Sequence, residues 1–116
     1  MIHTKLDILL NSSVIDKEAY DFAHKVIEFM KSEINSLAET EKADVFYTHL
    51  VMAVARQKNN DLPIAELDPD LKEDIKSSEH YIKAKELWKT IESLSPIEFS
   101  KEEPDYCYLH ICNLLQ

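Results

Sequence analysis

Two histidines on separate predicted helices are the residues of this chain best suited to chemistry. Neutral imidazole is abundant near neutral pH and can act as a nucleophile, a base or a metal ligand. His49 lies seven residues before Arg56, the single arginine among 13 basic residues. In a helix this spacing places both on one stripe, together with Val45 and Met52. The stripe fits either a phosphate site or a partly buried histidine beside an arginine that stabilises the helix C-terminus.

The second candidate, His110, lies in the last predicted helix. Glu103, Tyr106 and Asn113 fall on its side of that helix, at spacings of three, four and three. A carboxylate beside a histidine orients the ring and keeps it nucleophilic. The alternative is a core histidine that donates one ring proton to a carbonyl or carboxylate group. The other three histidines lie near the N-terminus or on polar stretches and are expected to be solvated surface residues: His3, His24 and His80.

The sequence lacks the motifs of the catalytic and metal sites that a helical protein could carry. No glutamate lies three residues before a histidine, and neither an adjacent His-Asp pair nor a Glu-x-x-Glu element occurs. The chain has no glycine, where about eight would be average, and this excludes glycine-rich phosphate loops. Cys107 and Cys112 are five residues apart and are expected to be reduced core cysteines. We therefore predict no enzymatic activity, no metal and no cofactor.

The charge and hydropathy of the chain restrict its partners. Thirteen basic and 22 acidic side chains give a formal net charge of −9. Such a surface repels phosphate backbones, so direct binding of DNA or RNA is not expected. No apolar run approaches the roughly 18 residues of a membrane helix, and the N-terminus lacks the apolar segment of a signal peptide. These features predict no membrane association and a cytoplasmic location.

Helical periodicity accounts for the remaining sequence. Apolar residues recur at spacings of three and four, which predicts helices over residues 16–37, 41–58 and 78–93. Thr40 and Asp68 are predicted N-caps, Asp68 for a short helix, and Ser100–Glu103 is predicted to be the capping box of a last helix that runs to Leu115. Residues 2–12 can add a short helix, and residues 59–67 are predicted to be a loop. The predicted fold class is all-α: a compact bundle of four to five helices in a single domain over residues 1–116.

Two of these segments together resemble the signatures of PTS regulation domains (PRDs). The segment from Thr48 to Arg56 is similar to the first signature, in which a His-Leu pair precedes an arginine near the end of a helix. The segment from Glu103 to Ile111 is similar to the second signature, a glutamate, an aromatic residue three positions on, and a Leu-His-Ile sequence after it. The stretch between them follows the family at Asp68-Pro69-Asp70-Leu71, and the resemblance extends from about Asp16 to the end of the chain.

This resemblance implies a helical, usually dimeric domain that controls bacterial transcription regulators according to sugar transport. In the family, the histidines at the His49 and His110 positions accept phosphate from the phosphocarrier protein or an enzyme II B component of the sugar phosphotransferase system. Arg56, Glu103 and Tyr106 are then expected to support the phosphate or to orient the rings. The resemblance also implies a homodimer, and one PRD copy without a nucleic-acid-binding module implies action through a partner such as a transcriptional regulator.

Two other functions stay open at the level of sequence. A bundle that has lost phosphate chemistry would be a constitutive dimerisation or interaction scaffold, and substitutions of His49 and His110 would then alter its stability only. A small-molecule sensor would instead have a pocket between the His49 and His110 stripes. Phosphate labelling tests the scaffold. A long distance between the side chains of His49 and His110 would exclude the sensor.

Overall fold

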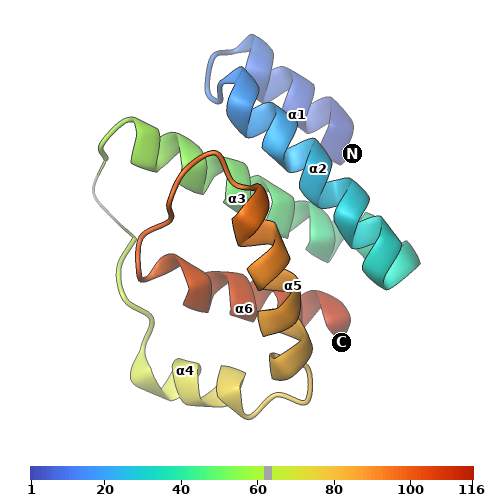
Figure 1. The fold of residues 1–116 in the computed structure, drawn as a ribbon, viewed down its shortest axis with the longest axis vertical. Coiled ribbons are helices and arrows are strands. Elements are labelled where there is room, and N and C mark those ends of the chain that lie inside the picture. Colours follow the sequence, from blue (N-terminus) through green and yellow to red (C-terminus); the bar gives the residue numbers. More distant parts are fainter. Residues whose placement is uncertain (62–63) are drawn as a thin grey trace.

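Six α-helices and one 3₁₀ helix form the part of the chain that the computed structural model describes, residues 1–61 and 64–116 (Figure 1). The all-α prediction is confirmed, because no strand occurs in these residues. The predicted count of four to five helices was wrong, since the N-terminal segment forms a full helix that buries Ile2 and Leu6. Two residues of the predicted 59–67 loop, 62 and 63, lie outside the described residues. The elements are α1 (Ile2–Asn11), α2 (Lys17–Ile34), η1 (Asn35–Glu39), α3 (Glu41–Lys58), α4 (Pro69–Lys76), α5 (Tyr81–Leu94) and α6 (Glu103–Leu115).

Helix α6 packs against three other helices. It contacts α3, α4 and α5 and buries Cys107, Ile111 and Leu114 among its residues. Helices α1 and α2 lie side by side, and both contact α3 (Figure 1). The two helices that carry the candidate histidines, α3 and α6, therefore pack directly against each other within one hydrophobic core.

Local capping explains where three of the helices begin. Asp16 Oδ1 accepts a hydrogen bond of 2.9 Å from the backbone of α2. At the start of α3, Thr40 Oγ1 accepts one of 3.2 Å from the N–H of Ala43. Asp68 caps α4, with Pro69 in the first helical turn. Each cap satisfies an N–H group that the helix leaves free, and the predicted N-caps Thr40 and Asp68 are confirmed.

Three predicted helix boundaries differ from the structure. The Ser100–Glu103 capping box does not form, because α6 begins at Glu103 and its side chain turns toward α3 instead of the backbone before the helix. Helix α5 begins after His80, since Ser78 Oγ accepts a 3.1 Å hydrogen bond from the His80 N–H in a turn. Helix α2 ends before Asn35, which adopts a positive φ of 54° and leads into the 3₁₀ helix.

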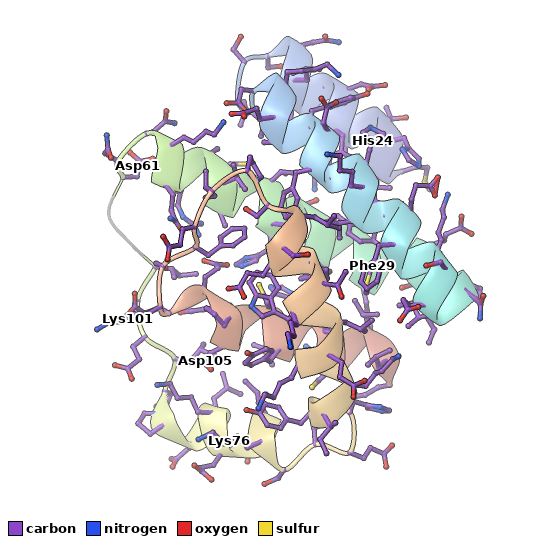
Figure 2. The ribbon with its side chains drawn as sticks, in the orientation of Figure 1. His24, Phe29, Asp61, Lys76, Lys101 and Asp105 are labelled. Atoms are coloured by element: carbon purple, nitrogen blue, oxygen red, sulfur yellow. The ribbon has the colours of Figure 1, made fainter. Side chains whose placement is uncertain are left out.

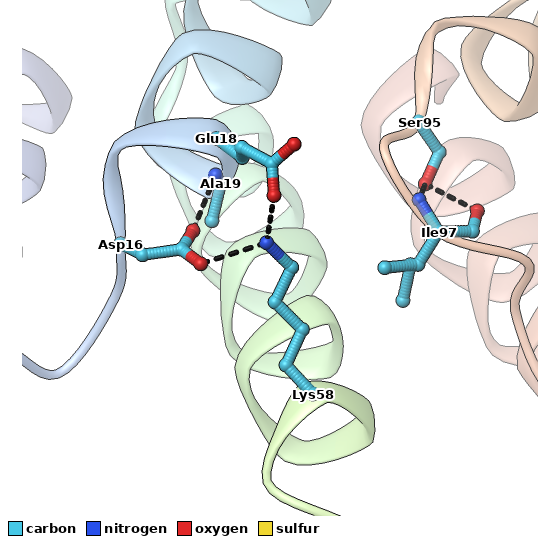
Figure 3. A network of polar contacts seen from close by, with 6 residues as sticks. All are labelled: Asp16, Glu18, Ala19, Lys58, Ser95 and Ile97. Atoms are coloured by element: carbon cyan, nitrogen blue, oxygen red, sulfur yellow. Dashed lines mark hydrogen bonds and ion pairs between the residues drawn. The ribbon is translucent and has the colours of Figure 1, made fainter.

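Lys58, in the last turn of α3, ties this helix to the start of α2 (Figure 3). Its Nζ lies 2.7 Å from Asp16 Oδ2 and also bonds to Glu18. The hydrogen bond between Lys58 and Asp16 lowers the pKa of the carboxyl group and raises the pKa of the amine. After α5, Ser95 Oγ accepts a 3.1 Å hydrogen bond from the N–H of Ile97 and donates one of 2.8 Å to its carbonyl. Both contacts fix segments that adjoin the helices of the candidate histidines.

His24 is less solvated than the sequence predicts. It lies on α2 beside α1 (Figure 2), where its ring stacks on His3 with centroids 5.2 Å apart and lies 4.5 Å from the Tyr20 ring. Its Nε2 is buried and has no hydrogen-bond partner among the described residues. The expectation of a solvated surface residue is therefore wrong for His24, because the packing of α1 against α2 covers the ring.

The cysteines agree with the sequence analysis. Cys107 and Cys112 are buried and unpaired, as predicted for reduced core cysteines. In the two described ranges, no helix has both the length and the apolarity needed to cross a membrane.

Candidate functional site

Helices α3 and α6 bring the five predicted site residues into one cluster. His49 and Arg56 come from α3, and Glu103, Tyr106 and His110 come from α6. His49 and Glu103 are 54 positions apart in the sequence, yet their side chains are hydrogen-bonded. The helix stripes predicted separately from the two segments thus face each other across one helix contact.

Glu103 is the charged centre of this cluster and is only 1% exposed. Its Oε1 bonds to Nε2 of His49, and its Oε2 lies 3.6 Å from Nη2 of Arg56. A buried carboxylate is tolerated only where such partners replace its water shell. Arg56 also lies in the last turn of α3, where its charge stabilises the helix C-terminus. The position of Arg56 agrees with an arginine that stabilises the helix C-terminus, and its role in a phosphate site stays a prediction.

The contact with Glu103 fixes the protonation of the His49 ring. A carboxylate can only accept a hydrogen bond, so Nε2 of His49 carries the proton that is donated to Oε1. In the neutral ring the lone pair is then left on Nδ1. His49 is 14% exposed at its side chain, which makes it a partly buried, oriented imidazole. A carboxylate–histidine pair of this kind fixes the tautomer and the orientation of the ring.

His110 lies directly against His49. The ring centroids are 4.7 Å apart with an interplanar angle of 40°, and the Phe46 ring lies 6.1 Å away on α3. Burial is the main cause that lowers the pKa of His110 to about 4; the neighbouring His49 contributes to this shift, and Glu103 opposes it. His110 is therefore a neutral imidazole at physiological pH. The two side chains lie close together, so the distance between them does not exclude the small-molecule sensor.

Tyr106 also lies against His49. Its ring is nearly parallel to that of His49, with centroids 6.1 Å apart and an angle of 20°. The hydroxyl is engaged elsewhere, since it donates a 2.6 Å hydrogen bond to the carbonyl of Ala65 in the segment before α4. Tyr106 therefore positions the His49 ring through its aromatic face and ties the preceding segment to the site.

Cys107 belongs to the site, although the sequence analysis assigned it only to the core. One ligand atom each of His49, Glu103 and Cys107 lie within 4.8 Å of one another, and these residue types can bind metal ions. However, Nε2 and Oε1 bond directly to each other, and burial raises the pKa of the thiol well above its ordinary value. In this geometry, Nε2 of His49 and Oε1 of Glu103 are occupied by the proton of their own hydrogen bond. The signal in the sequence was the spacing of four between Glu103 and Cys107, which places both on one helix face.

The fold and the site define an all-helical domain with a pair of histidines at the contact of two helices. Residues 24–114, nearly the whole chain, match the PRD domain model, so the chain belongs to the PRD family. The PRD is a regulatory rather than a catalytic domain. The match includes all five predicted site residues and confirms the resemblance seen in the two signature segments. No curated protein and no solved structure matches the chain.

Proposed function

We propose that this chain is a regulatory domain of the sugar phosphotransferase system, which accepts phosphate on histidine and modulates transcription regulation through a partner. The observation that carries the proposal is the paired-histidine site: the rings of His49 and His110 are in contact, and Glu103 holds His49 beside Arg56. Membership of the PRD family supports the regulatory role.

The acceptor chemistry follows from the bond to Glu103. Nδ1 of His49 attacks the phosphorus of a donor phosphohistidine, so that its lone pair forms the new N–P bond. The donor's N–P bond breaks, and its electron pair returns to the donor ring. Nε2 keeps its proton, and the carboxylate stabilises the positive charge that develops on the acceptor ring. Arg56, whose side chain is 35% exposed, supplies positive charge for the phosphoryl oxygens. His110 is neutral and can attack a donor in the same way.

The donor in this proposal is the phosphocarrier protein or an enzyme II B component, and the domain acts in the cytoplasm as a homodimer. Val45, one turn before His49, is 57% exposed and offers an apolar contact beside the acceptor. A dimer that uses this face would experience the phosphate charge at its interface. The net charge of −9 disfavours direct contact with nucleic acid, so the output passes to a transcriptional regulator.

Phosphate transfer tests this function directly. The full chain is incubated with phosphoenolpyruvate and the phosphotransferase cascade, with and without enzyme II B components. We expect acid-labile phosphate in the peptides that contain His49 or His110, and His80→Gln should label like the unchanged chain. Absence of phosphate with every donor contradicts the proposal. If His49→Ala and His110→Ala change only the stability of the protein, the chain is a scaffold.

Glu103→Gln separates ring orientation from packing. The amide has nearly the size of the carboxyl group but can donate as well as accept, so it no longer fixes the proton on Nε2 of His49. We expect phosphate incorporation at His49 to fall at least about tenfold, with the helical circular dichroism spectrum retained. Unchanged incorporation would show that Glu103 has no part in the transfer.

A further inference from the structure

The two candidate acceptors share their surroundings. The ring centroids of His49 and His110 are only 4.7 Å apart. The charged groups of the cluster are one carboxylate, Glu103, which bonds to His49, and one guanidinium, Arg56, which lies 3.6 Å from Glu103. Arg56 is the single arginine of the sequence. Two independent phosphate sites would each need a cation and a set of donors, whereas this cluster holds one arginine.

A second phosphoryl group would meet strong repulsion from the first. Each phosphoryl group adds close to two negative charges near neutral pH. For two dianions about 8 Å apart, Coulomb repulsion reduces double occupancy about 30-fold even with the dielectric constant of water, and further in a partly buried site. The carboxylate of Glu103, which is 1% exposed, adds a fixed negative charge between His49 and Arg56. Charge repulsion alone therefore makes a second phosphoryl transfer less favourable than the first.

We propose, on the basis of the proposed function, that His49 and His110 form one composite acceptor that holds a single phosphoryl group. In each transfer, a lone pair of one acceptor ring forms an N–P bond while the donor's N–P bond breaks and its electrons return to the donor. Once either ring carries the phosphoryl group, the other ring no longer accepts one from the donor. The domain therefore carries either no phosphoryl group or one, and the doubly phosphorylated state does not form.

The two rings remain individually competent in this arrangement. His110 is neutral, and loss of His49 leaves Glu103 paired with Arg56. Loss of His110 leaves the bond between His49 and Glu103 in place. A chain with either histidine alone is thus expected to accept one phosphoryl group, the same number as the unchanged pair.

Intact-mass spectrometry counts the phosphoryl groups on each chain. The full chain is used with His3, His24 and His80 replaced by glutamine, so that only the pair can react. The donors are the phosphotransferase cascade with phosphoenolpyruvate and, separately, potassium phosphoramidate, which phosphorylates imidazole without a protein donor. With either donor in excess, we expect saturation at one group in this chain, one in the His49→Gln variant, one in the His110→Gln variant and none when both are replaced.

The outcomes separate the two proposals. A chain that carries two groups as its main species overturns the composite acceptor, and so does a single substitution that abolishes labelling, since one histidine would then be the whole site. Failure of the cascade alone contradicts the proposed function, while phosphoramidate still counts the groups and decides the composite acceptor. Failure of both donors, with circular dichroism showing a folded chain, overturns both proposals.

Discussion

Mild acid should destabilise this fold through His110. The pKa of His110 is lowered to about 4 in the folded chain, first by burial and then by the neighbouring His49, whereas the ordinary value is 6.5. Between these two values the unfolded chain binds a proton that the folded chain does not. The stabilising contribution of neutral His110 is therefore complete above about pH 6.5 and is lost as the pH falls toward about 4.

The difference between the two pKa values of His110 sets the size of this effect. Each unit of pKa difference corresponds to about 1.4 kcal/mol, so the full difference between 6.5 and about 4 would change the free energy of unfolding by about 3 kcal/mol. His110 is only partly buried, so solvent screens part of this cost. We therefore expect the free energy of unfolding to fall by about 2 kcal/mol between about pH 7 and pH 4.5 through this residue alone.

Urea unfolding at several pH values provides the assay, with far-ultraviolet circular dichroism and the fluorescence of Trp88 as probes. Other groups titrate in the same range, so the informative quantity is the difference between the unchanged chain and His110→Phe, which keeps an aromatic ring but cannot bind a proton. This difference should shift by about 2 kcal/mol in favour of the variant as the pH falls. His80→Gln, a change in the turn between α4 and α5, should follow the unchanged chain. A difference that stays constant with pH would refute the assignment.

Three further substitutions have definite expected results. His24→Phe should leave thermal stability unchanged or raise it by up to about 1 kcal/mol, because it removes a buried nitrogen without a partner among the described residues; a clear loss would contradict this. Lys58→Met should cost no more than about 1 kcal/mol, and high salt should abolish the loss in denaturant titrations, since the carboxylates that it pairs with are at least half exposed. Tyr106→Phe should cost about 1 kcal/mol and speed hydrogen exchange near Ala65, whose carbonyl loses its donor; unchanged exchange would count against that role.

The parts of the fold that depend on neighbours in the sequence could be predicted. Thr40 and Asp68 begin helices because each side chain reaches an N–H group two or three residues further on, and this depends on local geometry alone. The Ser100–Glu103 capping box does not form because its last residue contacts a helix that is distant in the sequence. Glu103 has partners on α3, and a buried carboxylate that lost them would be strongly destabilising, so its side chain does not turn to the backbone before the helix. His24 was misjudged in the same way, because α1 covers it in the folded chain.

The site was only partly visible in the sequence. Helical spacing grouped His49 with Arg56, and His110 with Glu103 and Tyr106, but spacing within a helix says nothing about which helices meet. Only the resemblance to PRDs linked the two groups before the structure placed them together. Cys107 was missed as a neighbour of His49 because its apolar surroundings predict a core cysteine equally well.

The bond between His49 and Glu103 joins positions 54 residues apart, and Glu103 opens the final helix. A nascent chain that still lacks α6 has His49 without its carboxylate, without Tyr106 and without His110. A molecule whose last helix has detached is in the same condition. Under the proposed function, the acceptor is thus assembled only when α6 packs against α3, and a phosphoryl group on this domain would mark a molecule in which these two helices have met, as well as the supply of sugar.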